Sequence, residues 1–151
     1  MDQPEFPQDF KEFLRLLTES GVEYLVVGGY AVGYHGYPRT TADLDVWVRI
    51  SKENAARLVK TFHEFGMPVE QLNPEIFLEK DKVIRMGVPP LRIEVLTAID
   101  GVEFDDCYAN RVTYEIGGQT VNFIALPDLR TNKRAAGRHK DLDDLRHLPP
   151  S

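Results

Sequence analysis

The spacing of hydrophobic residues along the chain predicts several amphipathic helices. In the first, Phe10, Phe13 and Leu17 recur at intervals of three and four residues, which puts them on one helical face. In the second, Ser51 is a suitable N-cap residue and Gly66 ends the apolar stripe. The helices predicted from this pattern and its start and stop signals cover residues 7–19, 30–35, 51–65, 127–137 and 140–148.

Shorter apolar or alternating runs predict strands. The run 24–27 is apolar and β-prone and ends in the Gly28-Gly29 pair, as expected for a buried strand that enters a tight turn. Residues 41–48 alternate, so that Asp43 and Asp45 lie on the face opposite the aliphatic side chains. Further strands are predicted after Pro89-Pro90, at 91–96, and in two hairpins, 76–78 with 83–86 and 112–116 with 120–124. The pattern predicts a mixed or largely antiparallel sheet.

Length and composition fit one folded domain. The 151 residues include 42% hydrophobic and 28% charged residues, which is close to the average of soluble globular proteins. No internal repeat, low-complexity tract or Ser/Gly linker divides the chain. We therefore expect a single α+β domain over residues 1–151, with a mixed β-sheet flanked by helices.

The charge of the chain limits its partners. A formal net charge of -6 provides no global positive field, so an extended face for duplex DNA is not expected. One local basic cluster, which can meet phosphates, consists of Lys133, Arg134, Arg138, His139 and Lys140. This distribution is compatible with a nucleotide or one RNA end.

Cysteine usage and the N-terminal residues bear on the compartment. Cys107 is the only cysteine, so the chain forms neither an internal disulfide nor a cysteine-based zinc site. The first residues are partly acidic and include two prolines, where a signal peptide would have a basic flank and an apolar run. We expect a cytoplasmic protein without a membrane segment.

Asp43 and Asp45 are the first candidates for chemistry. Because they lie two residues apart on a predicted strand, their side chains share a face, with about 6.5–7 Å between their Cα atoms. A hard divalent cation such as Mg²⁺ or Mn²⁺ would neutralise the pair, and phosphate oxygens would complete its shell. Glu94 is a candidate third acid, provided that its strand pairs beside the first. Three such acids suit a two-metal in-line displacement, in which the third holds a metal or accepts a proton.

Candidate phosphate contacts precede these acids in the chain. Gly28 and Gly29 follow a buried strand and precede a helix, so phosphate oxygens could approach their backbone N–H groups. Arg39 can offer its planar guanidinium to the same phosphates, and the neighbouring Thr40 can help to orient it. These residues predict a nucleotide site beside the metal.

The order of these motifs resembles the polymerase-β-type nucleotidyltransferase superfamily. The resemblance rests on residues 25–29 (LVVGG), 39–46 (RTTADLDV) and 93–95 (IEV), in that order. Within the superfamily, the tail at 126–142 is similar to that of small bacterial and archaeal nucleotidyltransferases related to abortive-infection toxins of type IV toxin–antitoxin systems. The likeness spans residues 22–148.

The resemblance assigns the acids to metal binding and catalysis, and the turn and the basic residues to the nucleotide. Lys133 would neutralise the triphosphate, whereas Lys140 and Asp141 would touch the nucleotide or brace the last helix. The residues expected to bind metal and carry catalysis are Asp43, Asp45 and Glu94. Those expected to bind the nucleotide are Gly28, Gly29, Arg39, Thr40, Lys133 and Lys140.

Two positions depart from the common pattern of the superfamily. The turn is Gly28-Gly29 where many active members have Gly-Ser, so a hydroxyl that can bind a phosphate is missing. The third acid is Glu94 where aspartate is more usual, and its longer side chain could shift the second metal. Both variants occur in the superfamily, and neither excludes catalysis.

Each feature taken alone also has a purely structural explanation. An Asp-x-Asp pair is usually a solvated strand end, a Gly-Gly pair is usually a turn, and a strand glutamate is often paired with an arginine such as Arg92. Lys133, Arg134 and Arg138 could form a solvated helix face. Trp47 is expected to pack under a covering helix rather than to stack on a base.

The leading functional hypothesis is a transferase that moves a nucleoside monophosphate from an NTP to an acceptor hydroxyl and releases pyrophosphate. The acceptor stays open among tRNA ends, protein hydroxyls and small molecules, although the chain has no room for a large template-binding domain. The alternative is a catalytically weak nucleotide-binding or partner-binding regulatory module of the same fold. A toxin role with a cognate antitoxin is a further possibility, drawn from the resemblance alone.

Overall fold

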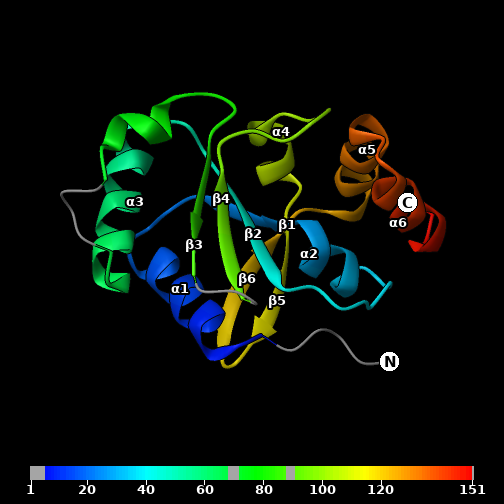
Figure 1. The fold of residues 1–151 in the computed structure, drawn as a ribbon, viewed down its shortest axis with the longest axis horizontal. Helices are drawn as coiled ribbons and strands as arrows, with labels where there is room; N and C mark the ends of the chain where they lie inside the picture. The colour runs from blue at the N-terminus through cyan, green and yellow to red at the C-terminus, as the bar shows by residue number, and fades with distance from the viewer. Residues whose placement is uncertain (1–5, 68–71, 88–90, 151) are drawn as a thin grey trace.

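The computed structural model describes residues 6–67, 72–87 and 91–150 (Figure 1). The strands are β1 (Tyr24–Val27), β2 (Asp43–Val48), β3 (Val83–Met86), β4 (Arg92–Leu96), β5 (Val112–Ile116) and β6 (Gln119–Phe123). The helices are α1 (Gln8–Glu19), α2 (Gly28–Tyr34), α3 (Lys52–Phe65), the 3₁₀ helix η2 (Pro74–Leu78), α4 (Phe104–Ala109), α5 (Leu126–Ala136) and α6 (His139–His147).

The strands of the described residues form one mixed sheet in the order β3-β4-β2-β1-β6-β5. The pairs β2·β4 and β1·β6 are parallel, whereas β1·β2, β3·β4 and β5·β6 are antiparallel. Parallel neighbours need a crossover connection, and the chain between β2 and β4 supplies one through α3, η2 and β3. The predicted α+β class, with a mixed sheet flanked by helices, is confirmed.

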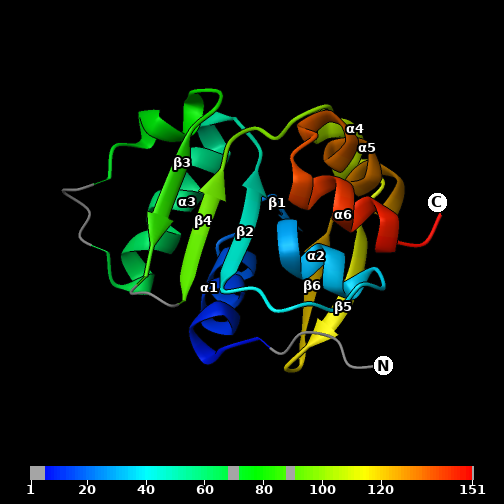
Figure 2. The same ribbon diagram turned by 45° about the vertical axis from the view of Figure 1, so that its right-hand side comes forward.

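Helices cover both sides of this sheet. In Figures 1 and 2, α1 and α3 lie together on one side, while α2, α5 and α6 gather on the other. Fully buried aromatic rings join α1, α3 and η2 on the first of these sides. The ring centroids are 5.6 Å apart for Phe13–Phe62 and 5.4 Å apart for Phe62–Phe77. Burial of each such ring contributes roughly 1.5–3 kcal/mol, so this layer anchors α1, α3 and η2 to one another.

Alternation along β2 separates the core from the candidate site. Leu44 and Val46 are fully buried, whereas Asp43 and Asp45 on the opposite face are only partly buried. Trp47 shares the face of the acids and packs edge-on against the Phe104 ring of α4, with the ring centroids 5.1 Å apart. The prediction that Trp47 packs under a helix is therefore confirmed.

One predicted strand is wrong. Residues 76–78 do not form a hairpin with 83–86, because they belong to η2, and β3 pairs with β4 instead. The Asn73 side chain accepts a hydrogen bond from the backbone N–H of Glu75, and proline follows Asn73 at the first helical position. Both features favour the start of a helical turn over a strand, and the short apolar run could not distinguish them.

The remaining elements lie within one or two residues of their predicted bounds, with one addition. Helix α4 was not expected, since six residues are too few to show helical periodicity. The predicted break at Pro89-Pro90 lies outside the described residues. In the ranges that the structure describes, no helix is long and apolar enough to cross a membrane.

Candidate active site

The three acids singled out in the sequence lie on two neighbouring strands. The parallel register of β2 and β4 puts Asp45 directly opposite Glu94, and Asp43 opposite Arg92. Side chains at paired positions of neighbouring strands point to the same face, with Cβ atoms about 5 Å apart. The pairing of β2 with β4 that the three acids require is therefore present, and Asp43, Asp45 and Glu94 share one face of the sheet.

Glu94 has a cationic neighbour on its other side. In the antiparallel pair β3·β4, Arg85 lies opposite Glu94, and its Nε donates a hydrogen bond of 2.6 Å to Glu94 Oε2. The Glu94 side chain is 17% exposed and that of Arg85 is 60% exposed, so the pair sits at the surface end of the acid cluster. The partner of Glu94 is thus Arg85 rather than Arg92, and it is identified by the register of β3 on β4.

The Asp45 carboxyl is in surroundings that disfavour its negative charge. Burial raises its pKa first, and the neighbouring Glu94 and Asp43 raise it further, to about 7, against the opposing charge of Lys140. Its Oδ1 is buried and has no hydrogen-bond partner among the described residues. A buried carboxylate oxygen without a donor is costly, and a proton or a cation would relieve that cost.

The Gly28-Gly29 turn leaves no space for side chains. Gly28 has a φ of +68°, in the left-handed region, and a Cβ added there would overlap the Asp45 carboxylate. A Cβ at Gly29 would lie only 2.8 Å from Thr41 Oγ1. Glycine at both positions therefore lets the turn pack directly on the residues that precede and form the start of β2.

Thr41 is a residue of this site that the sequence analysis did not single out. Its Oγ1 accepts a hydrogen bond of 3.3 Å from the backbone N–H of Asp43. The same hydroxyl lies against Gly29, where a serine side chain would otherwise project. Thr41 thus links the glycine turn to Asp43, the first candidate metal ligand. In the sequence, only its position two residues before Asp43 could have pointed to this role.

Two of the three cations expected to meet phosphates, Arg39 and Lys133, take part in an ion network. Arg39 donates hydrogen bonds of 3.0 and 3.1 Å to Asp144. The Lys133 Nζ lies 3.2 Å from Asp141 and 3.0 Å from Asp144, and none of these three side chains is more than 5% exposed. Buried carboxylates require such counter-charges. Lys133 therefore links α6 to α5, and Arg39 links α6 to the loop before β2. In this arrangement, the charges of both cations meet carboxylates of α6 rather than an open, phosphate-facing space.

Lys140, in the first turn of α6, and Arg138, the residue before this helix, approach the acids from the N-terminal end of α6. Both side chains are exposed, and the positive charge of Lys140 lowers the pKa of Asp45, against the larger effects that raise it. Asp141, which accepts a bond of 2.7 Å from Arg138, raises the pKa of this guanidinium, and Asp100 and Asp45 raise it further. The sequence assigned Lys140 to the nucleotide and left Arg138 in the general basic cluster. Thr40, the last predicted contact, is exposed in the loop before β2.

The donor chemistry of the acids fits a divalent cation, although no ready-made cage exists. In the described residues, no three His, Cys, Asp or Glu side chains are arranged to hold a metal as they stand, and Glu94 is engaged by Arg85. Mg²⁺ rarely needs a complete protein cage, because it keeps waters and binds through one or two carboxylates together with substrate phosphates. Asp43 and Asp45 meet that requirement, and the partner-free Oδ1 of Asp45 is a donor atom still to be satisfied.

Comparison with known proteins supports the fold assignment. No protein-family model matches the chain, and a search of curated proteins finds no match. Among solved structures, the chain is similar to a putative nucleotidyltransferase from Thermotoga maritima, with a TM-score of 0.59 and 16% sequence identity. The similarity covers 90% of this chain and 87% of the other. The mixed sheet with its flanking helices is thus a nucleotidyltransferase-like fold.

Proposed function

We propose that this chain is a metal-dependent nucleotidyltransferase, which moves a nucleoside monophosphate from an NTP to an acceptor hydroxyl and releases pyrophosphate. The observation that carries the proposal is the β2·β4 register, in which Asp45 lies beside Glu94 with Asp43 on the same face. Clustered carboxylates are costly unless they serve a cation. The fold similarity to the Thermotoga protein supports the same class of activity.

The proposed cofactor is Mg²⁺ or Mn²⁺, held by Asp43 and Asp45 with Glu94 as a third ligand. When bound, such an ion supplies positive charge that stabilises the reacting phosphate. The raised pKa of Asp45 and its partner-free Oδ1 support this role, because both are relieved by a cation. Glu94 would become a metal ligand only after its ion pair with Arg85 is broken. The exposed guanidinium of Arg85 would then be available to bind the triphosphate.

The nucleotide would lie between the glycine turn and the basic end of α6. Backbone N–H groups of Gly28 and Gly29 would meet phosphate oxygens, because no side chain obstructs them. Lys140 and Arg138, both exposed and both acting on Asp45, would neutralise the triphosphate. Thr40 is a further candidate contact, whereas Arg39 and Lys133 would act indirectly by holding α6 in position.

In the proposed reaction, the acceptor oxygen attacks the α-phosphorus. The bond between this phosphorus and the bridging oxygen to the β-phosphate breaks, so that pyrophosphate leaves with the bonding electrons. Once Arg85 has released Glu94, the carboxylate oxygen that does not bind the cation would accept the hydroxyl proton. Asp43 and Asp45 would hold the cation, which would supply positive charge beside this phosphate.

A nucleotide-binding or partner-binding regulatory module with weak turnover is a second candidate. The Glu94–Arg85 ion pair favours it, since a glutamate held by an arginine serves neither as a metal ligand nor as a base. A toxin role with a cognate antitoxin, and tRNA or protein as acceptor, are proposals that rest on the sequence resemblance alone.

The test supplies each of the four α-labelled NTPs with Mg²⁺ to the protein, together with total RNA and cell lysate. The Asp43→Asn/Asp45→Asn variant is the negative control, and Asp9→Asn, an exposed acid of α1, is the matched control. We expect label transfer by the wild type and by Asp9→Asn, and none by the double variant. Unchanged transfer by the double variant would refute the metal site, and Mg²⁺-NTP binding without transfer would favour the regulatory module.

A further inference from the structure

Two arginines flank Glu94 on the face of the sheet that carries the acids. Arg85 lies directly opposite Glu94 on β3, and Arg92 lies two residues before Glu94 on β4, opposite Asp43. Side chains at paired positions, and side chains two residues apart on a strand, point to the same face. Arg85 and Arg92 are therefore diagonal neighbours at about 7–8 Å, which is within reach of long side chains.

The positive charge of Arg92 has no partner. Arg92 is partly buried, and its guanidinium forms no hydrogen bond or ion pair with any residue that the structure describes, Asp43 included. Arg39 and Arg49 are also partly buried, but each is paired with a carboxylate. A guanidinium that is withdrawn from water without a partner is unfavourable, and a bound anion would relieve this cost.

Arg85 uses only part of its guanidinium. Its Nε donates the bond to Glu94, whereas its two terminal nitrogens donate to none of the described residues. The Arg85 side chain is mostly exposed, and ion pairs with such an exposed partner contribute little to stability. Arg85 can therefore exchange Glu94 for another anion at little cost. The planar guanidinium group suits phosphate, because it can donate two parallel hydrogen bonds to phosphate oxygens.

The arginines lie on an uncovered part of the sheet. In Figure 2, β3 and β4 lie in front of α3, whereas α2, α5 and α6 lie over the other half of the sheet. Gly87, which follows β3 and lies against the backbone of Arg92, has no side chain that could cover the guanidinium. A ligand can therefore reach Arg85 and Arg92 from solvent.

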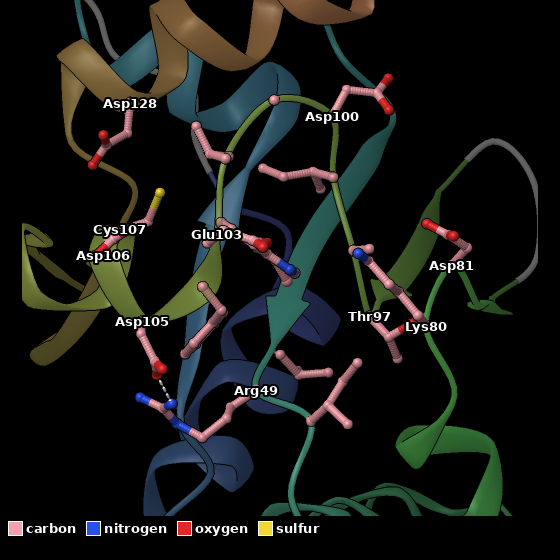
Figure 3. A pocket seen from close by; sticks show the side chains of 18 residues that line it. Arg49, Lys80, Asp81, Thr97, Asp100, Glu103, Asp105, Asp106, Cys107 and Asp128 are labelled. Carbon is pink, nitrogen blue, oxygen red and sulfur yellow. Dashed lines mark hydrogen bonds and ion pairs between the residues drawn. The ribbon is translucent and has the colours of Figure 1, made fainter.

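The charge around β4 favours an anion at the arginines over one at the carboxyl end of the strand. Beyond that end lies a cavity of about 810 Å³, which is lined by more acidic than basic side chains (Figure 3). Asp81, Asp100 and Asp105 project around it from separate segments of the chain. These acids repel an anion, whereas Arg85 and Arg92 attract it.

We propose that Arg85 and Arg92 form a phosphate-binding site, and that a phosphate bound there takes Arg85 from Glu94 and so frees Glu94 to bind the metal. The second part of this inference rests on the proposed metal site. Without phosphate, Arg85 occupies the third acid. Phosphate binding and metal binding are therefore cooperative, and each raises the affinity of the other by the same factor.

Two sources offer such a phosphate, namely the triphosphate of the nucleotide and a separate phosphate ion or ester. The glycine turn follows β1, which pairs with one edge of β2, whereas β4 and then β3 lie beyond the other edge. The turn and the two arginines thus lie on opposite sides of Asp43 and Asp45. This arrangement favours a phosphate that is separate from the nucleotide.

The first measurement is calorimetry of inorganic phosphate binding to the metal-free protein. We expect Arg92→Met to weaken binding at least about tenfold. The matched control is Arg57→Met, which removes the same charge from an exposed position on α3, on the other side of the sheet, and should bind as the wild type does. Circular dichroism checks that both variants fold. Equal phosphate binding by the wild type and Arg92→Met would overturn the proposal.

The same measurement on Glu94→Gln tests the exchange of partners. This variant should bind phosphate several-fold more tightly than the wild type, because Arg85 is no longer held by a carboxylate. In an Arg85→Met background, the same Glu94→Gln change should have little effect on phosphate affinity. An equal gain in both backgrounds would mean only a general charge effect and would refute the exchange.

The second measurement is Mn²⁺ binding with and without phosphate, followed by the paramagnetic resonance signal of free Mn²⁺. We expect phosphate to raise the Mn²⁺ affinity of the wild type about fivefold more than that of Arg92→Met. In Arg92→Met, direct contact between phosphate and metal is the only remaining route for such an effect. A phosphate effect of the same size in both proteins would contradict the cooperative release of Glu94.

A methylene-bridged NTP analogue distinguishes the two sources of phosphate. If Arg92→Met binds the analogue as the wild type does, and phosphate binds beside the analogue, the phosphate is separate from the nucleotide. If Arg92→Met weakens binding of the analogue as much as binding of phosphate, the site takes the triphosphate. If Arg92→Met weakens the binding of neither, the site does not exist.

The Asp43→Asn/Asp45→Asn variant separates this inference from the proposed function. If this variant loses Mn²⁺ binding, but phosphate does not change the Mn²⁺ affinity of the wild type, the inference fails and the metal site stands. If the variant binds Mn²⁺ as the wild type does, the proposed metal site fails, and the release of Glu94 to the metal fails with it.

Discussion

Replacement of Lys133 tests whether this residue supports the fold or binds phosphate directly. Its amine is buried between Asp141 and Asp144, each 1% exposed. Removing one partner of a buried ion pair typically costs about 3–5 kcal/mol, because the other charge is left without compensation. Arg138 still contacts Asp141 and Arg39 still contacts Asp144, so we expect the lower end of that range for Lys133→Met.

A loss of about 3 kcal/mol corresponds to a fall in Tm of roughly 6–12 °C for a chain of this size. Thermal and urea unfolding followed by circular dichroism measure it. The matched control is Arg134→Met, the exposed neighbour on α5, for which we expect a change within about 0.5 kcal/mol. If Lys133→Met unfolded like the wild type but lost Mg²⁺-NTP affinity, the residue would be a phosphate ligand and the structural role inferred here would be refuted.

Unfolding measured at low pH tests whether the stabilising effect of Lys133 is electrostatic. Although burial alone would raise it, Arg138 and Lys133 hold the pKa of Asp141 below its ordinary value of 3.8. A carboxyl with a depressed folded pKa stabilises the protein above its unfolded pKa, and this contribution disappears as the pH falls through the folded value. The difference in stability between wild type and Lys133→Met should therefore shrink below about pH 4.

Three further predictions concern the acids and the turn. Without divalent cations, Asp45→Asn should stabilise the protein by up to about 4 kcal/mol at pH 8 but little at pH 4. The folded pKa of about 7 makes stability fall as the pH rises from 3.8 to 7, by about 1.4 kcal/mol per pH unit, and equal unfolding curves at pH 8 would contradict this. Gly29→Ser should lower Mn²⁺-NTP affinity about tenfold, because the serine side chain would overlap Thr41. Adding Thr41→Ala to this variant should restore much of the affinity. Calorimetry that shows no such rescue would argue against the overlap. Arg85→Met should raise Mn²⁺ affinity several-fold by releasing Glu94, whereas weaker binding in a paramagnetic titration would remove Glu94 from the ligand set.

Most of the fold could be predicted because local pattern and packing agree. The alternation of β2 and the helical spacing of α1 and α3 reflect faces that are buried in the structure. Residues 76–78 show where the pattern fails, since a short apolar run suits a strand and a buried 3₁₀ turn equally well. The capping side chain of Asn73 and the proline after it were the stronger signals.

The candidate site was only partly predictable, because its decisive features depend on register and on long-range pairing. The acids were visible as residue types, but their convergence required β2 and β4 to be parallel neighbours. Arg85 beside Glu94 depends on the pairing of β3, and the burial of Lys133 depends on how α6 folds back on α5. The sequence identifies each basic residue, but it does not show which carboxylate that residue pairs with in the fold.

The most direct test of the central claim is a crystal structure with Mn²⁺ and an NTP analogue that carries a methylene bridge between its α- and β-phosphates. Anomalous scattering locates the metal without assumptions about the acceptor. We expect an anomalous peak bound by Asp43 and Asp45, with phosphate oxygens on the Gly28-Gly29 turn and Glu94 turned from Arg85 toward the metal. An analogue bound elsewhere, or bound at the turn with no metal on either aspartate, would contradict it.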